Sequence, residues 1–187
     1  MMSPSQLVDV NNSILLIIDI QTRLCAAMPD SPREKMLTHT NILCEAATSL
    51  NIPVLYTEQY PKGLGHTENI LLTSLGDIKP IEKTCFSCCD ADDFMFNLAQ
   101  NKQKQVIICG METHVCVLQT AMQLLDNGYS VFIVEDAVMS RHSLHHHNAL
   151  SRMKKTDIII SNYESVLFEW LRDASHPAFK FLAKFLH

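Results

Sequence analysis

Three ionisable side chains follow short apolar or extended runs and could together perform nucleophilic chemistry. Asp19 follows the run 14–18, Lys83 follows the segment 79–82, and Cys116 follows the turn that begins at Gly110. A thiol at the start of a helix faces unpaired N–H groups and the positive end of the helix dipole, which favour the nucleophilic thiolate. The same N–H groups can hold a developing oxyanion. These residue types indicate an active site with Cys116 as the nucleophile.

The elements that must position these residues alternate along the chain. Strand-length apolar runs occur at 14–18, 53–57, 106–109, 131–134 and 158–160, with a weaker sixth at 80–83. Helical patterns lie between them at about 33–50, 91–101, 116–127, 143–153 and 163–172. The strands mostly lack polar alternation, as expected when both faces are buried. The pattern predicts an α/β fold, a three-layer α/β/α sandwich with a mainly parallel sheet of about six strands.

Ligands of parallel sheets bind at the carboxyl edge of the strands. Asp19, Lys83 and the turn before Cys116 all fall on that edge, so we expect them to meet although they are 64 and 33 positions apart in the sequence. The segment 58–76 is the longest insertion in the pattern. We expect it to form a lid or a wall of the pocket.

Composition limits the range of partners. The 187 residues carry a formal net charge of −5, which argues against nucleic acid and anionic membranes as main partners. No apolar stretch reaches the roughly 20 residues that a membrane span needs. Seven cysteines and no N-terminal signal pattern favour free thiols in the cytoplasm. The length fits a single domain over residues 1–187, with a small molecule or a protein as its partner.

Residues 13–165 resemble the isochorismatase-like cysteine hydrolases. Asp19 after the first strand, Lys83 in the run Lys-Thr-Cys-Phe-Ser, and the Gly110 to Cys116 turn stand in the order and spacing of that family. The segment 58–65 and the ending 176–180 are most similar to the branch called isochorismatase domain-containing proteins. The resemblance implies the isochorismatase-like hydrolase fold and a homo-oligomer.

The resemblance also implies a mechanism without a cofactor. Asp19 would act as general base and acid, and Lys83 would hold Asp19 and favour the thiolate. Cys116 would attack a small amide-like or other C–N bonded substrate and form a covalent thioester-type intermediate that water hydrolyses. The N–H groups of Glu112 and Cys116 would form the oxyanion hole, with a cis peptide between Met111 and Glu112.

Several positions depart from the family pattern. Nicotinamidases carry an Asp-x-His metal signature after the second strand, whereas Thr57, Glu58 and Gln59 stand here, so we expect no metal. Glu112 and His114 replace the small residue and the aspartate common in the turn, which leaves the substrate open. We take as candidates for the substrate pocket five side chains at this edge: Gln21, Tyr60, His66, Phe86 and His114.

Three other clusters have simpler interpretations. Cys85, Cys88 and Cys89 lack a second cysteine pair at zinc-site distance and are expected to be free thiols near the active site. The run His145 to His147 splays around a helix and is expected to be a solvated surface or an oligomer contact. The apolar stretch 179–185 is expected to pack on its own domain or on a second subunit.

Each triad residue also has a structural interpretation. Asp19 could be a turn residue, Lys83 a solvated strand end and Cys116 a buried small hydrophobe. The alternative function is therefore a non-catalytic ligand-binding or scaffold protein that keeps the fold. The complete set of all three residues favours catalysis, because a scaffold needs none of them.

Overall fold

The computed structural model describes residues 6–185. Six strands form one sheet in the order β3-β2-β1-β4-β5-β6, and every neighbouring pair is parallel. The strands are β1 (Ser13–Ile18), β2 (Val54–Gln59), β3 (Ile81–Lys83), β4 (Gln105–Met111), β5 (Ser130–Met139) and β6 (Ile159–Ser161).

The α-helices of the described chain are mostly short, apart from one of 20 residues that crosses the sheet. They are α1 (Thr22–Ala26), α2 (Asp30–Ser49), α3 (Pro61–Leu64), α4 (Asn69–Leu75), α5 (Phe94–Ala99), α6 (Leu118–Asp126), α7 (Ser143–Met153), α8 (Tyr163–Leu171) and α9 (Phe179–Leu182). Single turns occur at η1 (Val10–Asn12), η2 (Cys88–Asp90) and η4 (Ala183–Phe185), and a π-helical turn, η3 (Thr113–Val117), precedes α6.

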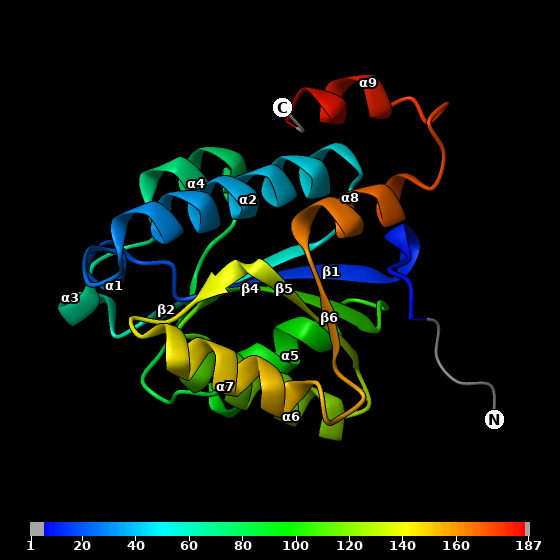
Figure 1. Ribbon diagram of the computed structural model, residues 1–187. Helices are drawn as coiled ribbons and strands as arrows, with labels where there is room; N and C mark the ends of the chain where they lie inside the picture. Colours follow the sequence, from blue (N-terminus) through cyan, green and yellow to red (C-terminus); the bar gives the residue numbers. More distant parts are fainter. Residues whose placement is uncertain (1–5, 186–187) are drawn as a thin grey trace.

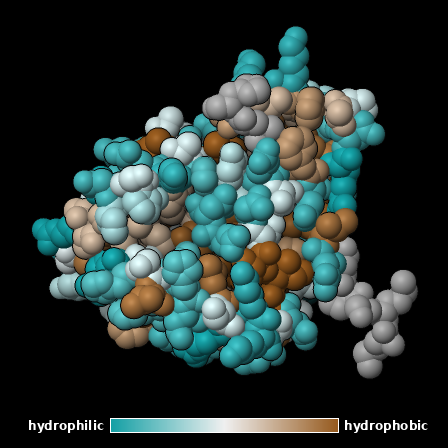
Figure 2. Space-filling model, viewed as in Figure 1, coloured by the Kyte–Doolittle hydropathy of each residue, from teal (hydrophilic) through white to brown (hydrophobic). Residues whose placement is uncertain are grey.

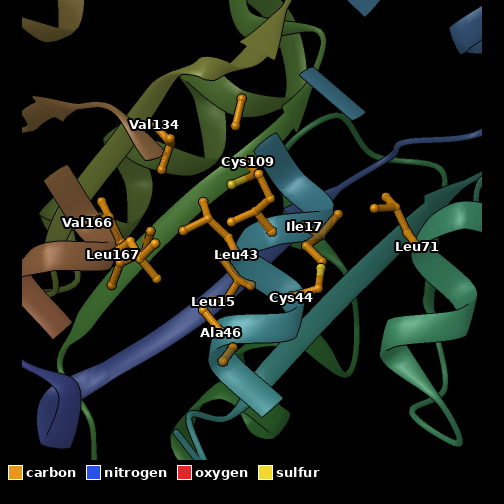
Figure 3. Close-up of a cluster of buried hydrophobic side chains, with 14 of the residues drawn as sticks. Leu15, Ile17, Leu43, Cys44, Ala46, Leu71, Cys109, Val134, Val166 and Leu167 are labelled. Atoms are coloured by element: carbon orange, nitrogen blue, oxygen red, sulfur yellow. The ribbon is translucent and has the colours of Figure 1, made fainter. Parts of the chain in front are cut away.

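The sheet lies between two layers of helices, as the sequence predicts (Figure 1). Helices α2, α4, α8 and α9 cover one face, and α5, α6 and α7 cover the other (Figure 1). β1 shows why its sequence is apolar throughout: Leu15 and Ile17 face one layer, while Leu16 and Ile18 face the other, and all are buried. Figure 3 shows Leu15, Ile17 and Cys109 of the sheet packed beneath Leu43 of α2.

The strand order reverses direction between β1 and β4, and this reversal fixes where a ligand site can form. β1 connects outward to β2 and β3, whereas β4 connects to β5 and β6 on the other side. The connections on the two sides leave a crevice at the carboxyl ends of β1 and β4. Asp19 follows one of these ends and the turn after Met111 follows the other.

The expected strands are all present. β6 extends one residue beyond its expected end, and three others extend two residues or more. β2 continues to Gln59, β4 to Met111 and β5 to Met139, so each delivers extra residues to the carboxyl edge. The helix expected over 116–127 is divided into the π-helical turn η3 and α6. Polar residues in β2 and β5 and Gly110 in β4 interrupt the apolar runs, and the strands continue past these interruptions.

The segment 58–76 is a fixed wall and not a free lid, which is the second of the two arrangements expected from sequence. It contains the end of β2 and the helices α3 and α4, and Leu71 and Leu75 of α4 are buried in the core. The Glu58 carboxylate accepts hydrogen bonds from the backbone N–H of Thr67 at 2.7 Å and from its hydroxyl at 2.9 Å. These contacts fix the segment as a wall beside the carboxyl edge.

The apolar C-terminal stretch packs on the same chain. Leu182 of α9 is fully buried, and Phe179 and Phe185 pack against the core cluster under α2 and α8. Phe181 remains 42% exposed, and Figure 2 shows apolar side chains around this helix at the top of the molecule. Across residues 6–185, none of the helices combines the length and apolar character that spanning a membrane requires.

Gly110 marks the closest approach of β4 to β1. Its φ is +128°, and a Cβ built there would collide with the backbone carbonyl of Ile18. Gly128 also has a positive φ, +80°, but a Cβ there would meet no atom within 4 Å. Only at Gly110 does the packing of the sheet itself exclude a side chain.

We therefore expect Gly110→Ala to lower the free energy of unfolding by about 3 kcal/mol or more, because strain and collision add. Gly128→Ala is the matched control and should cost only about 1 kcal/mol, since it brings strain alone. Urea unfolding followed by circular dichroism measures both. Equal losses for the two variants would contradict the close contact at Gly110.

Candidate active site

The centre of the site is a buried ion pair between Lys83 and Asp19. The Nζ of Lys83 lies 2.6 Å from Oδ2 of Asp19, and neither side chain has any exposed surface. Asp19 has a positive φ of 52° directly after β1, which turns it out of the strand. Its other carboxylate oxygen, Oδ1, accepts a hydrogen bond of 2.7 Å from the Thr57 hydroxyl. Lys83 at the end of β3 and Thr57 near the end of β2 thus each bond to one oxygen of the Asp19 carboxylate.

The charge of Lys83 is favoured despite its burial. Burial lowers the pKa of Lys83, but the Asp19 carboxylate and the nearby thiols of Cys88 and Cys116 together raise it above its ordinary value. The ammonium also donates to the carbonyl oxygens of Cys85 at 3.3 Å and Phe86 at 3.2 Å. Lys83 is therefore a cation at neutral pH with several acceptors around it.

Cys116 lies in the π-helical turn η3, beside this pair. It is 6% exposed, and the charges of Asp19 and Lys83 both act on its thiol. Burial raises the pKa of the Cys116 thiol, the charge of Asp19 raises it further, and the charge of Lys83 lowers it. The net shift is upward.

The resting thiol differs from the sequence expectation of a thiolate. The helix dipole and the charge of Lys83 favour the thiolate, whereas burial and the adjacent carboxylate dominate in the folded protein and raise the thiol pKa. At neutral pH, Cys116 is protonated, and the negative charge of the Asp19 carboxylate acts on its thiol. The arrangement is that of a nucleophile activated by a neighbouring base.

The turn between β4 and Cys116 is fixed from two directions. The peptide between Met111 and Glu112 is cis. The Glu112 carboxylate accepts hydrogen bonds from the Arg141 backbone N–H at 2.9 Å and from its Nε at 3.2 Å. Glu112 is 8% exposed, so its side chain faces the protein and its charge is met by Arg141.

His145 and His147 of α7 are exposed, as expected for a solvated helix surface, but His146 is partly buried and histidines of α7 also contact the same turn. His146 Nδ1 lies 3.0 Å from the Thr113 hydroxyl, and the ring of His145 lies 4.8 Å from the ring of His114. His114 Nδ1 also lies 3.0 Å from the Ser140 hydroxyl. Burial lowers the pKa of both His114 and His146, so both rings are neutral at pH 7.

The five candidates for the substrate pocket have different environments. Gln21 is fully buried, and its side-chain amide hydrogen-bonds to the backbone of Gln59 and Gly65. It therefore stabilises the carboxyl edge of the sheet and does not line a pocket. Tyr60 and Phe86, which follow the ends of β2 and β3, are both 56% exposed. His66 bonds to Glu58 through Nδ1 at 3.0 Å while its side chain is mostly exposed. His114 lies on the turn described above.

A cavity of about 380 Å³ opens on the Lys83 side of the triad. Tyr60, Lys83 and Cys85 line it together with acidic residues of the neighbouring loops, among them Asp90 and Asp92. Cys116 is not part of its lining. The cavity therefore lies behind the ammonium and not over the thiol.

Sequence reasoning missed two residues at the end of β2. Thr57 bonds to Asp19, and Gln59 Oε1 accepts a hydrogen bond of 2.7 Å from Lys83. The signal that could have found them is strand alternation, since residues two apart on a strand share a face. The strand expected from sequence ends at Thr57, so Gln59 falls outside it. From sequence, Gln59 is only one of the residues that stand in place of the Asp-x-His metal signature.

The described residues 6–185 contain no group of three or more His, Cys, Asp or Glu side chains arranged to hold a metal ion. At the end of β2, the side chains of Thr57, Glu58 and Gln59 are instead used in hydrogen bonds within the protein. All seven cysteines are free. Cys88 is fully buried, and burial raises the pKa of its thiol to about 12.

Comparison with known proteins identifies a family. Residues 13–164 match the isochorismatase domain. The isochorismatase domain-containing protein 2A of Mus musculus is 35% identical over 177 residues, which cover 94% of this chain and 82% of the mouse protein.

Two solved structures share the fold over nearly the whole chain. A protein from Caenorhabditis elegans described as MAR1 ribonuclease has a TM-score of 0.88 and 36% identity, covering 96% of this chain and 91% of its own. The YcaC gene product of Escherichia coli, described as an octameric hydrolase of unknown specificity, has a TM-score of 0.92 and 26% identity, covering 99% and 91%.

Replacing the two charges of the ion pair should change the reactivity of Cys116 in opposite directions. Lys83→Met removes the charge that lowers the thiol pKa, so alkylation by iodoacetamide at pH 8 should slow by about threefold to tenfold, up to one pKa unit. Asp19→Asn removes the charge that raises this pKa, so alkylation should accelerate by a similar factor. Mass spectrometry of the Cys116 peptide gives the rate for this thiol alone.

The exposed pair Lys154 and Glu135, 3.9 Å apart, supplies the matched controls Lys154→Met and Glu135→Gln. Neither should change the rate. Changes of the same sign in the two variants of the buried pair would contradict the assigned electrostatics.

Proposed function

Because this chain belongs to the isochorismatase-like hydrolase family, we propose that it is a metal-independent cysteine hydrolase of a small amide-like or other C–N bonded substrate. Cys116 is the nucleophile, Asp19 is the general base and acid, and Lys83 holds Asp19 and stabilises negative charge. The observation that carries the proposal is the fully buried ion pair of Lys83 and Asp19 beside the Cys116 thiol. A scaffold protein gains little from such a pair, because burying two charges costs several kcal/mol per ion.

The first half of the reaction forms a covalent intermediate. Asp19 takes the thiol proton as Cys116 Sγ attacks the substrate carbon, and the electron pair of the carbonyl bond moves to its oxygen. As this tetrahedral adduct collapses, the C–N bond breaks and Asp19 delivers the proton to the leaving nitrogen. The product of this half is a thioester on Cys116 and a free amine.

The second half uses the same carboxylate on water. Asp19 takes a proton from the attacking water, the C–S bond breaks, and the proton returns to the Cys116 sulfur. Lys83 stays protonated throughout, since its pKa is raised. The backbone N–H groups of Glu112 and Cys116 are the proposed donors to the oxyanion in both halves.

Two alternative hypotheses compete with the proposed hydrolase function. In the first, the chain is a non-catalytic ligand-binding or scaffold protein, and the triad is a relic. In the second, it cleaves RNA, because the 36% identical protein of Caenorhabditis elegans is described as a ribonuclease. The formal net charge of −5 speaks against the second, since nucleic-acid binding relies on basic surface.

We also propose that the chain forms a homo-oligomer and acts in the cytoplasm. The Escherichia coli relative is described as octameric, and free cysteines in this number suit a reducing compartment. Tyr60 and Phe86 are exposed in the single chain and would be available to a neighbouring copy.

The proposal is tested by a panel of small amides, ureides, carbamoyl compounds and an RNA oligonucleotide. We expect turnover of at least one small C–N compound by the wild type, and a loss of about 10³-fold or more in Cys116→Ala, since the nucleophile is absent. Cys25→Ala, at a buried free cysteine in α1, is the matched control and should keep full turnover. Turnover that survives in Cys116→Ala, or cleavage of RNA alone, would contradict the proposal.

Activity on the substrate so found should survive exhaustive chelation. The donors at the end of β2 are engaged with Asp19, Thr67 and Lys83, so a metal ion would have to break those bonds first. The rate is measured before and after dialysis against EDTA. Loss of activity with recovery on adding zinc would overturn the metal-free mechanism.

A further inference from the structure

The end of β2 serves the ion pair through alternate residues. Thr57 and Gln59 lie two positions apart and share one face, where they bond to Asp19 and Lys83 respectively. Glu58 lies between them on the opposite face and bonds to Thr67. The end of β2 thus contacts both members of the ion pair: the uncharged Thr57 bonds to Asp19, and the uncharged Gln59 bonds to Lys83.

Gln59 provides the second short bond to the ammonium. Lys83 Nζ lies 2.6 Å from Asp19 and 2.7 Å from Gln59 Oε1, whereas its two backbone acceptors lie at 3.2 and 3.3 Å. An ammonium has three N–H donors that rotate freely about the end of a flexible side chain. Two short bonds to fixed acceptors therefore define where its charge points.

Gln59 is itself held from three sides. Its side-chain Nε2 donates to the Thr84 carbonyl at 2.7 Å, which sets Oε1 toward Lys83. Its backbone N–H donates to Gln21 Oε1 at 2.7 Å, and its backbone carbonyl accepts from Gln21 Nε2 at 3.0 Å. Gln21 is fully buried, so this brace is shielded from water.

We propose that Gln59 is a positioning residue, whose neutral amide holds the Lys83 ammonium where it serves Asp19 and the developing charge on Cys116. This inference rests on the proposed function. The amide must be neutral because a carboxylate at the same place would compete with Asp19 for the ammonium. It would also add negative charge near a thiol that has to become negative.

Two substitutions test separately whether Gln59 must be a hydrogen-bond acceptor and whether that acceptor must be neutral. Gln59→Met keeps the length of the side chain but removes the amide acceptor, and Gln59→Glu keeps an oxygen in reach but adds a charge. Gln105 supplies matched controls, because it is also buried, at 4% exposure, and bonds to the Asp9 N–H at 2.6 Å at the opposite end of the sheet. The controls are Gln105→Met and Gln105→Glu.

The readout is the rate of Cys116 alkylation by iodoacetamide from pH 7 to 10, followed by mass spectrometry of the Cys116 peptide. Gln59→Met should slow this reaction at pH 8 by about threefold or more, and Gln59→Glu by about tenfold, which is one pKa unit of the thiol. The profiles of both should move to higher pH. Both Gln105 variants should follow the wild type even if their urea midpoints fall.

Lys83→Met is measured under the same conditions, because it distinguishes failure of the inference about Gln59 from failure of the proposed function. Wild-type profiles for both Gln59 variants with a slowed Lys83→Met would overturn the role of Gln59 and leave the triad intact. A wild-type profile for Lys83→Met itself would overturn the proposed function. Equal slowing in the Gln59 and Gln105 variants would show that lost stability, and not positioning, is the cause, which also overturns the inference.

Discussion

A lysine ammonium and a carboxylate meet at 2.6 Å with no exposed side-chain surface on either, and the carboxyl edge of the sheet is arranged around them. Removing two charges from water costs several kcal/mol per ion, and their attraction compensates only when the remaining donors and acceptors are also satisfied. Thr57 and Gln59 do this from β2, and the carbonyls of Cys85 and Phe86 do so from the loop after β3. The described chain leaves no buried side-chain nitrogen or oxygen without a partner.

The catalytic turn is held from the opposite side of the crevice. Gly110 allows β4 to press against β1, and Glu112 is tied to Arg141 after β5. The π-helical turn then carries Cys116 back over Asp19 before α6 begins. Because Asp19 follows β1 and Cys116 follows β4, the distance between them depends on the packing of β1 against β4 and not on any local motif.

Burial has opposite consequences for the two reactive groups. It raises the pKa of the Cys116 thiol, and it would lower that of Lys83 if the carboxylate and the thiols nearby did not outweigh it. The resting state therefore has a neutral thiol next to a compensated ion pair. In the proposed mechanism, the thiol proton moves to Asp19 as the sulfur attacks, which couples nucleophilic attack to proton transfer. This coupling suits a hydrolase whose nucleophile should not react with every electrophile in solution.

Much of the fold could be predicted from sequence because its signals are local. Apolar runs of strand length marked five strands, and a weaker pattern at 80–83 marked the sixth. Their alternation with helices predicted parallel pairing, so Asp19, Lys83 and Cys116 were expected at one edge. The short helices α1, α3 and α4 gave no such signal, since they are too short for a helical period to appear. The ends of β2, β4 and β5 were missed because polar residues in β2 and β5 and a glycine in β4 interrupt the apolar runs, although most of the residues beyond the interruption are buried.

The sequence by itself thus determined the family, the layer order and the meeting of Asp19, Lys83 and Cys116 at one edge of the sheet. Only the tertiary structure decided how these residues behave: that Cys116 rests as a thiol, that Gln59 reaches Lys83, and that His145 and His146 contact the catalytic turn. The reason is that pKa values and hydrogen-bond partners depend on the distances between side chains far apart in the chain. Those distances are set by the packing of whole strands and helices, which no local pattern specifies.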